Sequence, residues 1–258
     1  MINLLSVGYS KLFKNLAFRV CLIIMAALPM FLTAVSVSKT APGSGPLNGI
    51  YNTGMIFIGL LIGAFVSVYI SQDHSEKTLN NKIMAGYSRA VIYLADFIVT
   101  VSGALMMQLM CILASSLIAV PARGMYTEPF ADAVKQQFIL FCVVAVYTAL
   151  VLLICTVINS KAHAVAVSLM AVMVMLIAGI SVYDMTVRKG EAPAASTEVT
   201  TEDKVVKTLY NVLPQSQMYA VIEEHIPADA AKMICYDAAA IAVMTAAGIV
   251  IFKKKDIK

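Results

Sequence analysis

One short stretch of the chain has the residue types of a catalytic site. Glu223, Glu224 and His225 are consecutive, and carboxylates beside an imidazole are the groups that a hydrolase uses for acid–base catalysis. The other histidines, His74 and His163, are predicted to lie on the opposite side of a membrane, so no metal cluster can be assembled around His225. A solvated helix end is the favoured interpretation of the triplet, and an intramembrane enzyme is the alternative.

Polar side chains also occur inside apolar segments. Asp96 and Asp237 each lie about one helical turn from the end of an apolar segment, and Gln108 lies near the middle of one. An ionisable group within a membrane span is by default a functional candidate. Structural pairing near an interface is the favoured interpretation of both aspartates, and a proton-coupled secondary carrier is the alternative. Gln108 could line a substrate pathway.

The composition of the chain indicates a membrane protein. Of its 258 residues, 60% are hydrophobic and 13% are charged, and the mean hydropathy is +0.84. Soluble domains carry about 25% charged residues. A segment of about 20 apolar residues is long enough to cross a bilayer as a helix. Six such segments predict an all-α membrane protein with one transmembrane domain over residues 1–258, with spans at about 20–37, 51–70, 91–120, 138–158, 164–182 and 233–252.

Two further helical segments are predicted outside the spans. The apolar segment from Leu4 to Phe18 contains Lys11 and Lys14, which suits an N-terminal helix lying in the membrane interface. A flank that only anchors the first span is the alternative. Residues 183–232 are predicted to be an extracellular insertion between the fifth and sixth spans. Its second half has apolar residues at helical spacing with Pro214 between them, which predicts a broken amphipathic helix at the outer membrane face.

Small residues form a ridge in the second span. Gly59, Gly63 and Ser67 recur every four residues, and such a ridge lets another helix approach closely. Packing within one subunit is the favoured interpretation, and a dimer interface is the alternative.

The basic residues predict the orientation of the spans. With the N-terminus in the cytoplasm, the two short outer loops hold only Lys39, Arg123 and Lys135, whereas the short inner segments are rich in Lys and Arg. The pattern predicts a multi-pass protein of the cell membrane with both termini cytoplasmic. Membrane lipids are expected partners. Nucleic acid is not, because no Lys/Arg run is interleaved with aromatic residues.

The loop between the second and third spans has the sequence signals of a complete short helix. Asp73 followed by Glu76 is an N-capping pattern. Leu79 and Ile83 lie four residues apart on one face, and Gly86 is expected to end the helix in a left-handed conformation. Ser88 is then expected to cap the helix of the third span. A capped helix between two spans can transmit a push from outside the membrane. An ordinary solvated loop with the basic residues of the cytoplasmic side is the alternative.

The same loop resembles that of ABC-2 type transporter permeases. The matching runs are Glu76-Lys-Thr-Leu-Asn-Asn-Lys-Ile and Ala85-Gly-Tyr-Ser-Arg-Ala-Val-Ile-Tyr-Leu. Lys77 stands where that family usually has glycine, and Asn80 where a basic residue is common. The six spans, the leading interfacial helix and the insertion before the last span are similar in layout as well.

The resemblance implies that the loop helix couples this chain to a separate cytoplasmic ABC ATPase, which would bind the ATP and Mg²⁺. The chain itself has no GxxxxGK[ST] phosphate loop, so no cofactor and no enzymatic activity of its own are expected. A second permease chain, identical or related, is implied, as is the export of a peptide or other amphiphile. The residues expected to couple to the ATPase are Glu76, Lys77, Thr78, Leu79, Asn80, Lys82, Ile83 and Gly86.

Overall fold

The structure is a computed structural model that describes residues 1–39, 49–75, 78–158, 160–191, 201–224, 227 and 229–254. Every regular element within these ranges is a helix. In chain order they are α1 (Ile2–Lys14), α2 (Leu16–Lys39), the 3-10 helix η1 (Ile50–Phe57), α3 (Ile58–Ser75), α4 (Thr78–Met84), α5 (Arg89–Arg123), α6 (Phe130–Val157), α7 (Lys161–Glu191), α8 (Thr201–Val212), α9 (Pro214–Glu224) and α10 (Ala230–Lys254).

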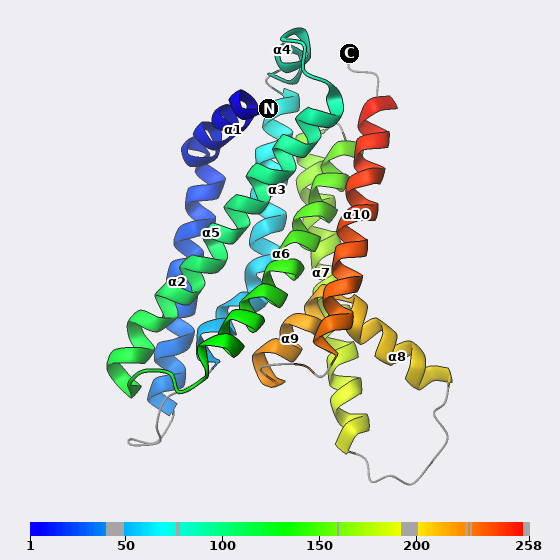
Figure 1. The fold of residues 1–258 in the computed structure, drawn as a ribbon. Coiled ribbons are helices and arrows are strands. Elements are labelled where there is room, and N and C mark those ends of the chain that lie inside the picture. The colour runs from blue at the N-terminus through cyan, green and yellow to red at the C-terminus, as the bar shows by residue number, and fades with distance from the viewer. Residues whose placement is uncertain are drawn as a thin grey trace.

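Among the described residues, six helical segments are long and apolar enough to cross a membrane, which confirms the predicted all-α architecture and suggests a multi-pass membrane protein. They are Leu16–Lys39, Ile50–Asp73, Arg89–Arg123, Phe130–Val157, Lys161–Val187 and Ala230–Lys254. Figure 1 shows them as one bundle, with α1, α4 and the C-terminal end of α10 at the same end. We call this the basic end and the opposite one the far end.

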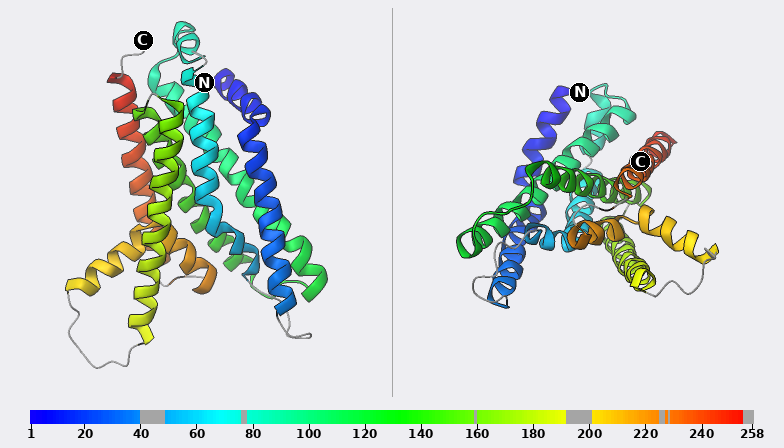
Figure 2. Two further views of the ribbon diagram at one scale, coloured as in Figure 1. Left: turned by 180° about the vertical axis from the view of Figure 1, so that it is seen from behind. Right: turned by 60° about the horizontal axis from the view of Figure 1, so that its bottom comes forward.

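The centre of the bundle is formed by α3, α5 and α6. On α3, the side chains of Ile58, Ile62, Phe65 and Tyr69 recur every three or four residues and are buried, as expected for one face of a helix. In the 18-residue apolar stretch of α6, 67% of the residues are buried, whereas in that of α10 only 11% are buried. α10 lies on the outside of the bundle (Figure 2), and its exposed apolar side chains, such as Val243 and Val250, are left for lipid.

Several helices extend beyond the predicted spans. The fourth span begins at Phe130 and not near residue 138, with Pro129 as the residue that precedes the helix. The fifth continues to Glu191, because a helix needs no apolar residues once it has left the membrane. α5 has 35 residues, about 52 Å at 1.5 Å per residue, and it crosses the bundle obliquely (Figure 1).

The insertion before the last span is helical and broken where the sequence predicts. α8 ends at Val212 and α9 begins at Pro214. Val205, Leu209 and Val212 are exposed on α8, and this apolar stripe suits the predicted position at a membrane surface. Figures 1 and 2 show α8 projecting sideways from the bundle.

The second helix of the insertion differs from its predicted surface position. α9 packs against α6 and α7, and Gln215, Ser216 and Gln217 are buried. Burial is tolerated because these side chains have partners: Tyr147 Oη donates to Gln215 Oε1 over 2.9 Å, and Gln217 Nε2 donates to the Asn211 carbonyl over 2.7 Å. Contacts with other helices therefore bury α9, although its amphipathic pattern predicts a position at the membrane surface.

Gly54 gives a direct test of the packing at the far end. A Cβ at this position would overlap the ring of Pro29 in α2 and lie 2.8 Å from Cys111 Sγ in α5. We expect Gly54→Ala to lower the free energy of unfolding by about 1–3 kcal/mol, the usual effect of overpacking. Thermal unfolding in detergent measures this, with Thr53→Ala as the neighbouring control. An unchanged midpoint for Gly54→Ala would show that α2 and η1 can separate freely.

Candidate functional site

The loop helix at the basic end is present and has most of its predicted boundaries. α4 ends at Met84, and Gly86 has a φ of 86°, the left-handed conformation that glycine adopts readily. The Gly86 amide donates to the Ile83 carbonyl over 2.9 Å. Ser88 is the N-cap of α5, and its side chain accepts a hydrogen bond from the Val91 amide. Both expectations are confirmed.

The expected role of Asp73 as an N-cap is wrong. Asp73 lies within the last turn of α3, which continues to Ser75, while α4 begins only at Thr78. The Asp73 carboxylate contacts two lysines from other elements. Its Oδ1 lies 2.5 Å from Lys11 Nζ and its Oδ2 lies 2.8 Å from Lys82 Nζ. Asp73 therefore takes part in ion pairs with other elements and does not cap α4.

Lys82 extends these contacts to a third helix. Its Nζ also lies 3.3 Å from Asp96 Oδ1 on α5. We call Lys11, Asp73, Lys82 and Asp96 the ion-pair cluster. Through it the loop helix α4 is tied to α3 and α5 directly, and to α1 through the carboxylate of Asp73.

The cluster is shielded from solvent. The exposed fractions of the side chains are 7% for Asp73, 16% for Asp96, 17% for Lys82 and 24% for Lys11. Burial by itself would lower the pKa of Lys82, but the carboxylates of Asp96 and Asp73 outweigh this effect and raise the pKa above its ordinary value. Because the pKa is raised, the contribution of Lys82 to stability is complete at neutral pH and is lost only as the pH rises above about 10.4.

Lys11 also interacts with the backbone of α3. Its Nζ donates to the Tyr69 carbonyl over 2.9 Å and lies 4.3 Å from the centre of the Tyr69 ring, which adds a cation–π contact. Lys11 therefore contacts both the backbone and the ring of Tyr69 as well as the Asp73 carboxylate.

Further hydrogen bonds attach α1 to the bundle. Tyr9 Oη lies 2.8 Å from Ser102 Oγ on α5, and Tyr69 Oη donates to the Gly8 carbonyl over 3.1 Å. Asn15 Nδ2 donates to Gln72 Oε1 over 2.8 Å. The predicted interfacial helix is thus fixed to the same two helices that hold α4.

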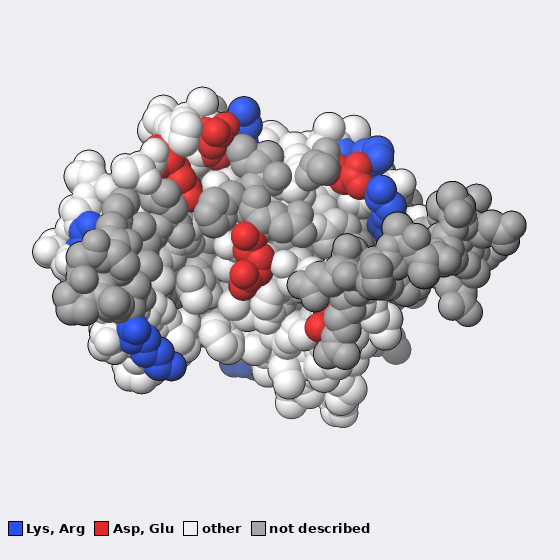
Figure 3. All heavy atoms as spheres, turned by 90° about the horizontal axis from the view of Figure 1, so that it is seen from below, with Lys and Arg blue, Asp and Glu red and all other residues white. Residues whose placement is uncertain are grey.

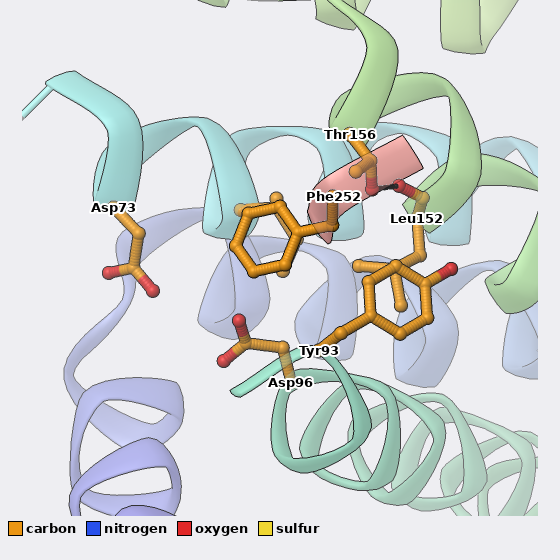
Figure 4. Close-up of a pocket in the computed structure, with 7 residues that line it drawn as sticks. Asp73, Tyr93, Asp96, Leu152, Thr156 and Phe252 are labelled. Atoms are coloured by element: carbon orange, nitrogen blue, oxygen red, sulfur yellow. Dashed lines mark hydrogen bonds between the residues drawn. The ribbon is translucent and has the colours of Figure 1, made fainter. Parts of the chain in front are cut away.

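A small cavity lies beside the cluster. It has a volume of about 20 Å³ and its lining includes Asp73, Tyr93, Asp96, Thr156 and Phe252. Figure 4 shows the carboxylates of Asp73 and Asp96 on one side of the Phe252 ring. This volume is enough for a single water molecule and too small for a transported substrate. What the described contacts show of the cluster is that it joins α1, α3, α4 and α5.

The structure describes the side chains of only some of the other residues that are predicted to couple to the ATPase. Ile83 is half-buried and packs against the core, and Lys82 belongs to the ion-pair cluster. Glu76 and Lys77 lie outside the described residues. For the first three residues of α4 the structure describes the backbone as helical but not the side chains; these are Thr78, Leu79 and Asn80.

The ridge of small residues on α3 contacts helices of the same chain. A Cβ on Gly59 would lie 3.2 Å from the Tyr147 ring of α6, and one on Gly63 would lie 3.4 Å from Val172 of α7. Ser67 is buried, and its hydroxyl donates to the Ala64 carbonyl. In this arrangement the ridge serves packing within one subunit.

Gln108 belongs to a buried polar chain at the far end that the sequence did not reveal. Its Nε2 donates to Gln137 Oε1 over 2.9 Å, and Gln137 Nε2 donates to Asn52 Oδ1 over 2.7 Å. Asn52 Nδ2 in turn donates to Gln136 Oε1, which also accepts a hydrogen bond from Tyr51 Oη. The consecutive glutamines ahead of an apolar run were the one available signal, but only the fold shows that they meet Asn52 and Tyr51.

The structure describes the two alternative sites, the triplet Glu223 to His225 and the buried Asp237, to different extents. Glu223 is exposed at the end of α9, the Glu224 side chain is not described, and His225 lies outside the described residues. No group of three or more His, Cys, Asp or Glu residues able to hold a metal occurs in the described part of the chain. Asp237 is buried, and Gln217 Nε2 donates to its Oδ1 over 3.0 Å.

A comparison of the whole chain with protein-family models and with curated protein sequences finds no match.

Proposed function

We propose that this chain is the permease subunit of an ATP-driven transporter of the ABC-2 type. A separate cytoplasmic ATPase would bind it at α4. The observation that carries the proposal is the ion-pair cluster, which joins α4 to α1, α3 and α5. Because α4 is a short element outside the membrane, a partner that moves it would act on Asp73 and Asp96 and hence on two central helices.

The cargo and the assembly follow from the resemblance in sequence. The cargo that we propose is a peptide or other amphiphile, exported across the cell membrane. Two permease chains, identical or related, would pair with two ATPase subunits, and ATP and Mg²⁺ would be bound by the ATPases alone. ATP-driven closure of these subunits would push the two copies of α4 together and reorient the spans.

The distribution of charge supports a cytoplasmic basic end. Among the described side chains, eight basic residues lie there with two acidic ones, Asp73 and Asp96. The basic residues are Lys11, Lys14, Arg19, Lys82, Arg89, Lys161, Lys253 and Lys254. Figure 3 looks onto the far end, where both acidic and basic side chains are spread among uncharged ones. An excess of Lys and Arg marks the cytoplasmic side of membrane proteins.

Cysteine labelling tests this orientation. Met84 and Met125 lie at opposite ends and are 77% and 75% exposed. In intact cells, a membrane-impermeant maleimide is expected to label Met125→Cys but to reach Met84→Cys only after permeabilisation. The unaltered chain is the background control, since its five cysteines lie within spans. The reverse labelling pattern would place α4 outside the cell and exclude an ATPase partner there.

Purification of the complex tests the function itself. A tagged full-length chain, extracted from its native membrane in mild detergent, is expected to bring down an ATPase that contains a GxxxxGK[ST] loop. Vesicles containing this complex are expected to transport only when ATP is present. Absence of such an ATPase from the purified chain would contradict the proposal.

A proton-coupled carrier is the second candidate, because Asp237 is buried within a span and its Oδ2 has no hydrogen-bond partner among the described residues. Such a group is a candidate proton site. Transport that runs on a proton gradient without ATP, and that Asp237→Asn abolishes, would replace the first proposal with this one.

A further inference from the structure

An open apolar groove runs along the outer surface between α5 and α10. Its volume is about 560 Å³, and its lining includes Leu94 and Phe97 of α5 and Ala238, Ala242, Ala246 and Ile249 of α10. The alanines recur every four residues and therefore lie on one face of α10. Because their side chains are single methyl groups, they leave a hollow beside the larger side chains of α5.

The groove ends at a group of cations. Lys253 follows Ile249 by four residues and so continues the same face of α10, and both Lys253 and Lys254 are exposed. Arg89, at the start of α5, donates from Nη1 to the carbonyls of Phe252 and Lys253 over 3.2 and 3.0 Å. Its positive charge is therefore held at the same mouth of the groove.

The length of the groove matches one leaflet of a bilayer. Ala238 and Ile249 are eleven residues apart, about 16 Å along a helix, and half of the ~30 Å hydrocarbon layer is about 15 Å. Lys253 lies about 6 Å further along the helix, at the level where lipid headgroups begin. The apolar and the cationic parts of the groove thus have the spacing of an acyl chain and its headgroup.

We propose that this groove is a binding site for an anionic phospholipid, with one acyl chain beside the alanines of α10 and the phosphate near Lys253, Lys254 and Arg89. The charge favours this occupant over a second copy of the chain. A copy in the same membrane orientation would bring its own Lys253 and Lys254 to the same depth, and like charges repel. The inference needs only the membrane-spanning fold and is independent of the ATPase.

Native mass spectrometry of the full-length chain tests the site, with dioleoylphosphatidylglycerol and dioleoylphosphatidylcholine as probes. We expect one phosphatidylglycerol to bind more tightly than phosphatidylcholine. A lysine near an anionic lipid is worth roughly fivefold in affinity. Lys253→Gln with Lys254→Gln is therefore expected to weaken phosphatidylglycerol binding by about 25-fold and to leave phosphatidylcholine nearly unchanged. Ala242→Phe, which fills the groove, is expected to weaken both lipids.

Two controls separate this site from general attraction to the membrane. Val243→Phe places the same phenylalanine side chain at an exposed position of α10 outside the groove lining, and Lys14→Gln with Lys161→Gln removes two exposed charges from the same end. Neither is expected to change binding. The proposal is overturned if the two lipids bind equally, if Ala242→Phe has no effect, if the second lysine pair matters as much as the first, or if the groove holds a second copy that Ala242→Phe releases.

Discussion

Asp73→Asn is expected to cause a large loss of stability and to weaken the attachment of α4 to the bundle. The substitution removes the carboxylate that Lys11 and Lys82 share, and it leaves Lys11 shielded from water without its acidic partner. Breaking a buried ion pair costs about 3–5 kcal/mol, whereas exposed pairs contribute about 0–1 kcal/mol. Since the Asp73 side chain is only 7% exposed, we expect the decrease in the free energy of unfolding to approach the larger value.

The matched control for this variant is Asp132→Asn. Asp132 pairs with Lys135 over 2.9 Å, but the two side chains are 36% and 62% exposed. Its loss is therefore expected to change the free energy of unfolding by less than about 1 kcal/mol. Denaturant titration in detergent measures both variants. Equal effects of the two substitutions would show that the ion-pair cluster is an ordinary surface feature and would remove the physical basis of the proposed coupling.

Met84→Pro is expected to abolish ATPase binding while the bundle stays folded. Met84 is the last residue of α4 and is exposed. A proline there removes the hydrogen bond to the fourth preceding carbonyl and clashes with that carbonyl, at a cost of about 3 kcal/mol. For a helix of seven residues, this penalty corresponds to a more than hundredfold loss of the helical population.

Copurification of the ATPase with the tagged chain measures the effect. Met84→Ala removes the same side chain and leaves the backbone able to form the helix, so its ATPase content is expected to match that of the unaltered chain. The unfolding midpoint of Met84→Ala is expected to stay constant. That of Met84→Pro is expected to fall, because Lys82 and Ile83 of α4 lose their contacts with the bundle, but the six spans are expected to remain folded. Full retention of the ATPase by Met84→Pro would mean that the partner binds elsewhere.

The features that the sequence predicted correctly depend on short-range chemistry. The six spans follow from local runs of apolar residues, and the break between α8 and α9 follows from the proline at position 214. Gly86 and Ser88 act within their own turns of the chain. Each of these signals is complete within a few residues, so no knowledge of the tertiary structure is needed.

The features that could not be predicted depend on contacts between distant segments. Asp73 is followed by Glu76 in a capping pattern, yet its carboxylate binds Lys11, 62 residues away in sequence. Gln108 and Gln137 meet in the interior because α5 and α6 pack at that depth. The burial of α9 also depends on partners from other elements, such as Tyr147. Periodicity shows which side chains share a face but not what that face contacts.

The central claim, that an ATPase docks on α4, is tested most directly by photo-crosslinking in intact cells. The photoreactive amino acid p-benzoylphenylalanine is placed at position 84, and for comparison at position 125, which is equally exposed at the far end. Position 84 is expected to crosslink to a protein with a GxxxxGK[ST] phosphate loop, and position 125 is not. Crosslinks from position 84 to lipid alone, or the same protein captured from both positions, would contradict it.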